Sequence, residues 1–431
     1  MRAHTEPRHL RQRLAASPLR ILSYRLIAFL TVLGPGFVTA NVDNDPGGIL
    51  TYSQAGATYG YTLLWTLIPT TIALIVVQEM AARMGAVTGK GLSDLIREEF
   101  GLRVTFFTMF VLGVADLGNI AAEFAGLASG LGMFGVSKYI SVPIGAALVW
   151  LAVVRGSYKN VERVLLALSL VYFAYPVSAF LAHPDWKQSL TDTLVPRLRP
   201  DPGYIAMIVG LIGTTITPWM QFYLQASVVE KGISKKNLNL CRIDVILGCI
   251  VTDVIAFFIV VACAATIFQS NHREISDVAE AAKALAPFAG QFAALLFGVG
   301  LINASLMSAA ILPLATTYNI CEGLGFEAGI DRRFSEARVF YGLYTALIVF
   351  GAGFVLVPRL PLLQVILISQ VANGILLPFV LTFMLLLVNR PRLMGEYRNR
   401  TWANVIAGGT SVVMVVLTLA LLWTSTFGAS V

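Results

Sequence analysis

The sequence predicts an all-α polytopic membrane protein of about eleven transmembrane helices. Of its 431 residues, 57% are hydrophobic and only 13% are charged, and the mean hydropathy is +0.75. Apolar stretches of roughly 18 residues or more, each able to cross a hydrocarbon core of about 30 Å as a helix, recur along the chain. Two of these stretches contain helix-breaking sequences. No soluble domain of this size has such a composition.

The apolar stretches define the expected helices in chain order. These spans are 26–57, 61–82, 104–133, 139–154, 164–182, 203–229, 243–269, 285–318, 338–357, 361–388 and 403–424. Residues 1–25 precede the first apolar stretch, are rich in arginine and form an expected cytoplasmic tail.

The positions of the 31 Lys and Arg predict the orientation. Most lie in the tail or in loops after even-numbered spans, which the positive-inside rule places in the cytoplasm. The exceptions are Lys138, Lys187, Arg197, Arg199, Arg273, Lys283 and Arg359. We therefore expect a multi-pass protein of the cell (inner) membrane, with the N-terminus in the cytoplasm and the C-terminus outside. Because this orientation accounts for the net charge of +7, nothing points to a nucleic-acid partner or to an obligate protein partner.

The residues that usually carry catalysis or bind structural metals are placed unfavourably for either role. The four histidines lie in the tail or in outer loops, and the four cysteines have no metal-site spacing. No nucleophile, base and oxyanion set is available, so we expect no enzyme activity, no catalytic residue and no cofactor.

The first interrupted helix contains Asp45-Pro46-Gly47-Gly48. Pro46 lacks an N–H and disfavours helix at Asp45, and the two glycines allow almost any backbone angle. Carbonyls freed by such a break must bond protein, water or an ion, because lipid offers no partner. A carboxylate at bilayer depth costs energy and therefore indicates a functional site.

The second interruption lies in the sixth span, at Gly213-Thr214-Thr215-Ile216-Thr217-Pro218. Breaks in the first and sixth spans imply two five-helix repeats of opposite orientation, with a binding site where the breaks meet. The expected repeats are 26–182 and 203–388, with 403–424 as an additional eleventh helix. This arrangement is the LeuT-type 5+5 inverted repeat.

Several motifs resemble the NRAMP divalent-metal transporter family over spans one to ten. The matching residues are Gly34-Pro35-Gly36-Phe37, Asp45-Pro46-Gly47, Gln78 to Gly85, Thr88 to Leu92, Ala122 to Gly126, Ser369-Gln370 and Leu377-Pro378-Phe379. The resemblance implies a transporter of divalent metal cations that works by alternating access.

The departures from the family pattern fall on its metal site. Gly48 stands where the family has asparagine, and Thr217-Pro218-Trp219 replaces methionine, proline and histidine. A thioether favours transition metals, whereas threonine oxygens suit Mg²⁺ or Ca²⁺. A wider, oxygen-lined site suits an ion that keeps several waters, as Mg²⁺ does. The altered pattern is similar to the NRAMP-related magnesium transporters, which implies partly hydrated Mg²⁺ as substrate, with Mn²⁺ also carried.

The residue chemistry and the resemblance together suggest the ligands. We expect Asp45 as the charged ligand or as an anchor for coordinated water. Carbonyls near Asn44, Thr214 and Thr217, with the two threonine hydroxyls, are expected to face the ion or its waters. Gln370 is expected to hold a coordinated water. Gly48 and Trp219 shape the cavity.

The sequence argues against proton coupling. Trp219 replaces the family's histidine, and Ile120 stands where the family has an aspartate, although Glu123 is kept. The roles of Asp43, Asp116, Glu123 and Asp253 stay open. The close alternative is a proton-coupled Mn²⁺/Fe²⁺ symporter of the ordinary NRAMP type. A sodium-coupled amino-acid symporter is disfavoured because Asp45 would repel a substrate carboxylate, and a channel or receptor would not need two matched breaks.

Overall fold

The computed structural model describes residues 44–155, 169–199, 201–269, 275, 277–327 and 336–427. These residues form helices joined by short loops, and no strand occurs among them. The first half of the chain supplies α4 (Pro46–Tyr59), α5 (Leu67–Thr88), α6 (Leu92–Phe100), α7 (Leu102–Gly132), α8 (Lys138–Val154), α10 (Ala174–Leu181), α11 (Trp186–Leu194), α12 (Pro202–Thr215) and α13 (Pro218–Glu230). The second half supplies α14 (Leu238–Cys263), α15 (Val278–Ala281), α16 (Ala286–Ala289), α17 (Ala293–Leu324), α18 (Arg338–Val355), α19 (Leu362–Val388), α20 (Pro391–Met394) and α21 (Thr401–Phe427). Shorter helical turns are η1 (Leu64–Thr66), η2 (Ser169–Phe173), η3 (Lys235–Asn237), η4 (Ala264–Phe268), η5 (Ala282–Leu285), η6 (Gly290–Phe292) and η7 (Gly395–Tyr397).

The helices confirm an all-α membrane architecture. Eight helical segments within the described residues are long and apolar enough to span a bilayer, and two shorter apolar helices accompany them. Residues 26–43 and 164–168 of the predicted spans lie outside the described residues, so the count of eleven remains a prediction.

One predicted boundary is displaced clearly. The span expected at 285–318 begins as α17 only at Ala293, because Pro287 and Gly290 divide the preceding residues into short helical pieces. Its other end reaches Leu324, where Gly325 adopts a left-handed conformation, φ 80°, and closes the helix.

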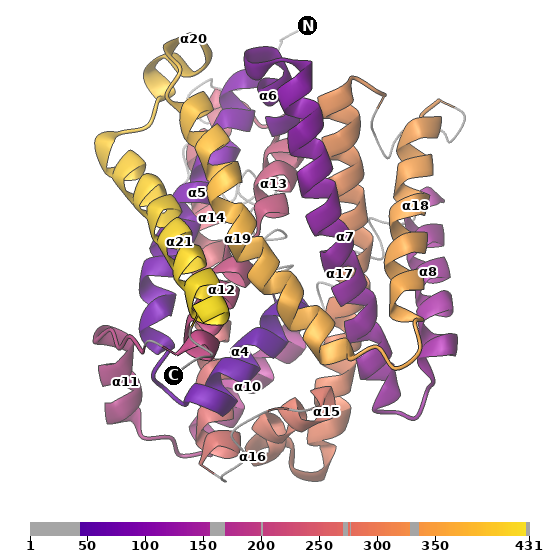
Figure 1. The fold of residues 1–431 in the computed structure, drawn as a ribbon, viewed down its shortest axis with the longest axis vertical. Coiled ribbons are helices and arrows are strands. Elements are labelled where there is room, and N and C mark those ends of the chain that lie inside the picture. The colour runs from indigo at the N-terminus through magenta and orange to yellow at the C-terminus, as the bar shows by residue number, and fades with distance from the viewer. Residues whose placement is uncertain are drawn as a thin grey trace, which may run out of the picture.

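The helices form a bundle around the short α4 (Figure 1). α7 packs along α17 and α19, α12 packs on α19, and α14 packs against α4 and α5. α8 and α18 form one flank, and α21 lies on the other, against α19, α12 and α5.

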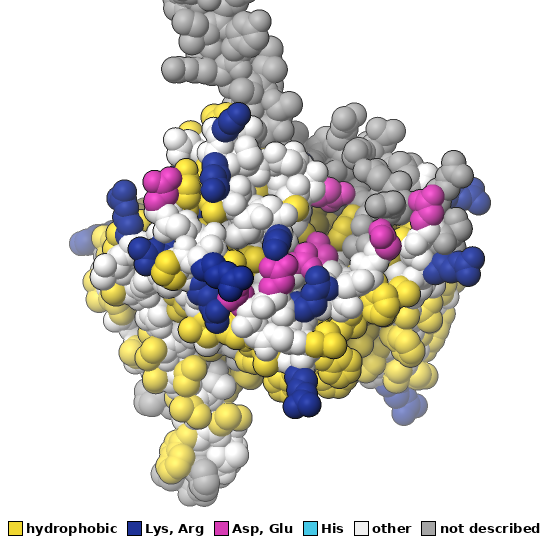
Figure 2. Space-filling model, turned by 90° about the horizontal axis from the view of Figure 1, so that it is seen from above, with side chains coloured by type: hydrophobic (Ala, Val, Ile, Leu, Met, Phe, Trp, Pro, Cys, Tyr) yellow, Lys and Arg dark blue, Asp and Glu magenta, His cyan; other side chains and the backbone are white. Residues whose placement is uncertain are grey.

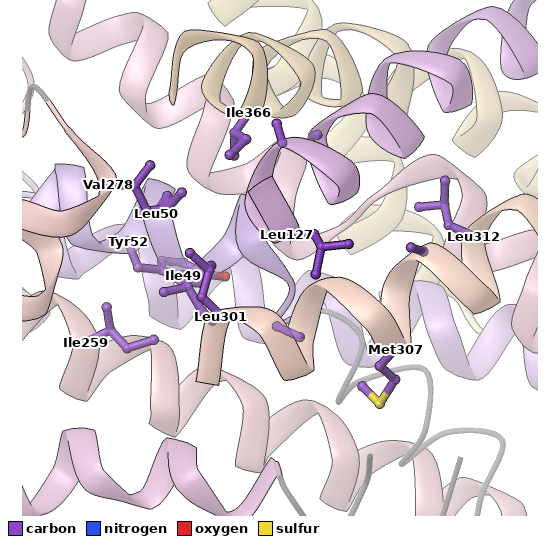
Figure 3. Close-up of a cluster of buried hydrophobic side chains, with 14 of the residues drawn as sticks. Ile49, Leu50, Tyr52, Leu127, Ile259, Val278, Leu301, Met307, Leu312 and Ile366 are labelled. Atoms are coloured by element: carbon purple, nitrogen blue, oxygen red, sulfur yellow. The ribbon is translucent and has the colours of Figure 1, made fainter. Parts of the chain in front are cut away.

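Figure 3 shows the apolar packing that holds α4 in place. Ile49 and Leu50 of α4 are at most 2% exposed and lie among side chains of α17 and α14, such as Leu301 and Ile259. Within a bilayer, such packing stabilises the helix through close van der Waals contacts. The broken helix is therefore anchored from its apolar side, which leaves its N-terminus as the polar end.

The two ends of the bundle differ in charge. Figure 2 shows the end formed by α6 and α20, where Lys and Arg side chains gather above an apolar belt. We call this the basic end; its residues include Lys90, Arg97, Lys235, Arg390 and Arg398. The opposite end carries α11, α15 and α16.

Candidate metal site

The first break places a carboxylate at the N-terminus of α4. Asp45 is the N-cap, with extended backbone angles, and its Oδ1 accepts a hydrogen bond from the Gly48 N–H at 2.7 Å. Pro46 occupies the first helical position, where its missing N–H costs nothing. Asp45 is only 6% exposed. The cap fixes the carboxylate at the break and uses one of its oxygens for Gly48, which is the second glycine of the predicted motif.

Asn44 and Glu123 add further polar atoms near this break. The Asn44 carboxamide and both Glu123 carboxyl oxygens are buried, and the carboxamide has no hydrogen-bond partner within the described part of the chain. The Glu123 carboxyl group lies within hydrogen-bonding reach of Asp45. Glu123, from α7, is close enough to Asp45 for the two carboxyl groups to interact electrostatically. Two buried carboxylates that close together require a proton or a cation to relieve their repulsion. The sequence left the role of Glu123 open; an acid at membrane depth in the third span was the available signal.

Gln370 of α19 lies directly against the first break. A Cβ on Gly47 would meet the Gln370 Nε2 at 2.0 Å, so only glycine admits this approach. The Gln370 Oε1 accepts from the Asn373 Nδ2 at 3.1 Å. The Gln370 Nε2, which also donates to the Ser369 Oγ at 3.0 Å, therefore faces the break.

The second break separates α12 from α13. α12 ends at Thr215, Ile216 leaves the helical conformation, and α13 begins at Pro218. Thr217 is the N-cap of α13, and its buried hydroxyl has no partner among the described residues. Its carbonyl already accepts from the Met220 N–H at 3.2 Å and from the Gln221 amide at 3.4 Å. The hydroxyl, rather than the carbonyl, is the open acceptor at Thr217.

The C-terminus of α12 brings helix-end carbonyls to the same region. Thr214 is 2% exposed and lies in the last turn, where carbonyls have no partner within the helix. This end carries the negative part of the helix dipole and favours a cation.

Close backbone contacts join the two breaks to α19. A Cβ on Gly213 would meet the Gln370 carbonyl oxygen at 2.2 Å and the Gly374 nitrogen at 2.4 Å. The hydroxyls of Tyr52 and Thr215 lie 2.6 Å apart, one on α4 and one on α12. Since Thr215 Oγ1 donates to the Leu211 carbonyl at 2.7 Å, Tyr52 is the donor of this bond. These contacts bring Asp45 and Gln370 together and set the last turn of α12, which contains Thr214, against α19 beside them. We call this region the polar centre.

Other candidate residues lie elsewhere. Asp116 accepts a hydrogen bond from the Thr316 hydroxyl of α17 at 2.7 Å, and Asp253 lies near Thr71, where α14 faces α5. A Cβ on Gly351 would lie 2.4 Å from Ile120, so α18 packs tightly against this apolar side chain. Trp219 is buried, 6.0 Å from the Tyr223 ring. Asp43 lies outside the described residues.

A cavity of about 700 Å³ opens from the end opposite the basic end. Gln54 of α4, Ala128 of α7 and Leu367 of α19 form part of its wall, and Asp277 lies at its rim. Leu367 lies three residues before Gln370, which is about one helical turn. Along α19, the cavity therefore reaches to within about one helical turn of Gln370.

The described residues contain no group of three or more His, Cys, Asp or Glu side chains placed to hold a metal. A cation at the polar centre would be held by one or two carboxyl groups, backbone carbonyls, hydroxyl and amide groups, and water. Oxygen ligands of this kind are typical of hard divalent cations.

Comparison with known proteins agrees with this fold. A crystal structure of the Eremococcus coleocola manganese transporter, in complex with an aromatic bis-isothiourea substituted compound, superposes with a TM-score of 0.74 at 21% identity, over 94% of this chain and 88% of that chain. The structure of MhsT in complex with L-phenylalanine gives a TM-score of 0.59 at 14% identity, over 90% and 98% of the two chains. These neighbours establish the LeuT-type fold.

The divalent metal cation transporter MntH of Aeromonas hydrophila is 28% identical over 398 residues, which is 90% of this chain and 94% of that protein. The family model described as natural resistance-associated macrophage protein-like matches residues 36–424. This chain therefore belongs to the Nramp family, as its motifs predicted.

Proposed function

We propose that this protein imports divalent metal cations by alternating access, and that Mg²⁺ is its main substrate, with Mn²⁺ also carried. The Asp45 carboxylate carries the proposal: it is held at a helix break, beside Gln370 and the end of α12. Related proteins, such as MntH of Aeromonas hydrophila, are named divalent metal cation transporters. A carboxylate between two broken helices also suits a cation and repels an anion.

The preference for Mg²⁺ follows from the hard character of the available ligands. Thr217 offers a hydroxyl where a methionine would offer a thioether, and Gly48 removes a side chain from the first break. Gln370 presents a donor nitrogen, which suits a water oxygen on the ion rather than the ion itself. Because Mg²⁺ loses its waters reluctantly, such a site suits a partly hydrated Mg²⁺.

The membrane potential is a sufficient driving force for such an importer. Each 100 mV contributes about 2.3 kcal/mol per charge and acts twice on a divalent cation. We propose that the cavity lined by Gln54 and Asp277 is the outer entrance and that the basic end is cytoplasmic. Uncoupled transport is consistent with the apolar packing of Ile120 against α18.

One observation favours the alternative, a proton-coupled Mn²⁺/Fe²⁺ symporter. Glu123 lies close to Asp45, and a pair of buried carboxyl groups is a natural place for a proton to be exchanged against a cation. The choice between these functions depends on whether Glu123 releases a proton during transport.

The deciding experiment is uptake into proteoliposomes that contain a magnesium-sensitive dye or an internal pH dye. We expect Mg²⁺ entry without acidification, and loss of that entry in Asp45→Asn. In the Glu123→Gln variant, Mg²⁺ entry should depend on external pH in the same way as in the unmodified protein. Mn²⁺ entry with acidification, no Mg²⁺ entry, and loss of the acidification in Glu123→Gln would instead establish the proton-coupled symporter.

A further inference from the structure

A basic cavity of about 620 Å³ lies at the basic end, away from the proposed metal site. It is bounded by α5, α14, η7 and the start of α21. Its charged lining consists of Arg83, Arg242, Arg398, Arg400, Glu79 and Glu396. Positive charge is in excess, and Figure 2 shows the basic face to which the cavity belongs.

The charge in this cavity is only partly neutralised. Glu79 serves both Arg83, at 2.9 Å, and Arg242, at 2.8 Å. Within the described chain, Arg398 and Arg400 are exposed and have no ion-pair partner. Two guanidinium groups are thus available for an anion, beside a scaffold that the Glu79 pairs hold rigid.

An apolar groove continues from this cavity along the same pair of helices. The groove, of about 610 Å³, is lined by Ile72 and Ala73 of α5 and by Val405, Ile406 and Gly409 of α21, among others. None of the described residues that line it is charged. Ile75 and Trp402 line the basic cavity one turn away from Ile72 and Val405. The cavity and the groove therefore lie next to each other along α5 and α21, and we call them together the α5–α21 seam.

The dimensions and position of the seam match a phospholipid. From Trp402, in the basic cavity, to Leu417, the last groove residue on α21, the helix rises about 22 Å at 1.5 Å per residue. One leaflet contributes roughly half of a hydrocarbon core of about 30 Å, so the groove is long enough for an acyl chain. Trp402 is 57% exposed beside the basic cavity, a position that suits an aromatic side chain at headgroup depth.

We propose that the α5–α21 seam is a binding site for one anionic phospholipid. Its phosphate bonds Arg398 and Arg400, and an acyl chain lies in the groove along α21. The lipid would join α21 to α5 in the leaflet at the basic end. This assignment does not depend on which cation the protein carries.

Binding is measured by native mass spectrometry of the full chain in detergent, titrated with phosphatidylglycerol or with phosphatidylcholine of the same acyl chains. We expect phosphatidylglycerol to bind roughly thirtyfold more tightly, since each arginine near a headgroup contributes about fivefold. Arg398→Ala combined with Arg400→Ala should abolish this preference. Arg392→Ala removes an exposed arginine of α20 that does not line the cavity, and should leave the preference unchanged.

Two adjacent glycines provide a matched test of the groove. A Cβ at Gly408 or Gly409 meets no atom within 4 Å, but only Gly409 lines the groove. Gly409→Leu should weaken binding of both lipids by about tenfold or more, whereas Gly408→Leu should not. Unchanged elution and thermal melting of both variants verify that each is folded.

Free phosphate is the other source of the same anion chemistry. If the seam binds a phospholipid, 20 mM inorganic phosphate should not displace phosphatidylglycerol, because phosphate cannot occupy the groove. Displacement by phosphate together with an unaffected Gly409→Leu variant would overturn the lipid site in favour of a small-anion site. Equal binding of the two lipids by the unmodified protein would also overturn it.

Discussion

The two helix breaks differ in the polar groups that they present. The first break holds a carboxylate in place through its own cap, Asp45 to Gly48, and receives a side-chain amide from α19. The second break carries no charged side chain: it offers the hydroxyl of Thr217 and the carbonyls at the end of α12. In the proposed cation site, the first break therefore supplies the charge and the second supplies neutral oxygens.

This division predicts that the first break controls whether a cation binds and the second controls which cation binds. A substitution at Asp45 should therefore affect every cation equally. A substitution at Thr217 should change the relative rates for different cations.

The largest effect is expected for Asp45→Asn. This substitution keeps the shape of the side chain and a cap acceptor but removes the charge, so uptake of Mg²⁺ and Mn²⁺ should both fall by about a hundredfold or more. Dye-based uptake in proteoliposomes measures it. Loss of Mg²⁺ uptake with Mn²⁺ uptake intact would contradict the proposed division between the breaks.

The next largest effect is expected where α12 touches α19. Gly213→Ala would place a Cβ 2.2 Å from the Gln370 carbonyl, and the resulting strain of about 2–3 kcal/mol should lower the Tm by about 2–3 °C. Gly210→Ala is the control, because its Cβ finds its nearest neighbour at an ordinary 3.5 Å. Equal melting of the two variants would show that the helices separate readily.

A smaller effect, in selectivity, is expected for Thr217→Met. The thioether should raise the Mn²⁺ to Mg²⁺ uptake ratio by about fivefold, because a soft ligand favours the transition metal. Thr217→Val removes the hydroxyl without adding sulfur, so it separates the effect of losing the hydroxyl from the effect of gaining the thioether. Competition uptake at equal free concentrations measures the ratio, and an unchanged ratio would remove Thr217 from the selectivity site.

The smallest effect is expected for Tyr52→Phe, which removes the bond between the two breaks. A neutral hydrogen bond contributes about 1 kcal/mol, so Mg²⁺ uptake should change by about fivefold or less. Initial rates of uptake measure it, and Tyr61→Phe, on a side chain outside the two breaks, is the control. A loss as large as that of Asp45→Asn would mean that Tyr52 belongs to the site itself.

Local sequence signals predicted much of this architecture. Proline, glycine and threonine placed the second break at Ile216 and Thr217, where the structure has it, because these residues act on their own backbone. The Asp45 cap was likewise encoded within four residues.

Contacts between distant segments could not be read from local patterns. The approach of Glu123 to Asp45 depends on how α7 packs beside α4. The family resemblance placed Gln370 in the site. It did not predict that the Gln370 amide packs against Gly47, since a resemblance gives a position but not a side-chain orientation. The division of the eighth predicted span was missed because the span was defined by its apolar composition, and the helix-breaking effect of Pro287 and Gly290 was not considered.

The side chains that connect α7 to α19 have a consequence for proton movement. Asn119 and Asn373 exchange two hydrogen bonds of 2.9 Å, Asn373 continues to Gln370, and Asn119 reaches Asp116. Amides neither gain nor lose protons near neutral pH. The chain therefore orients Gln370 but gives Asp116 no route for proton transfer to the polar centre through these amides. An acid on the same helix as Glu123 is thus excluded from proton exchange along this route.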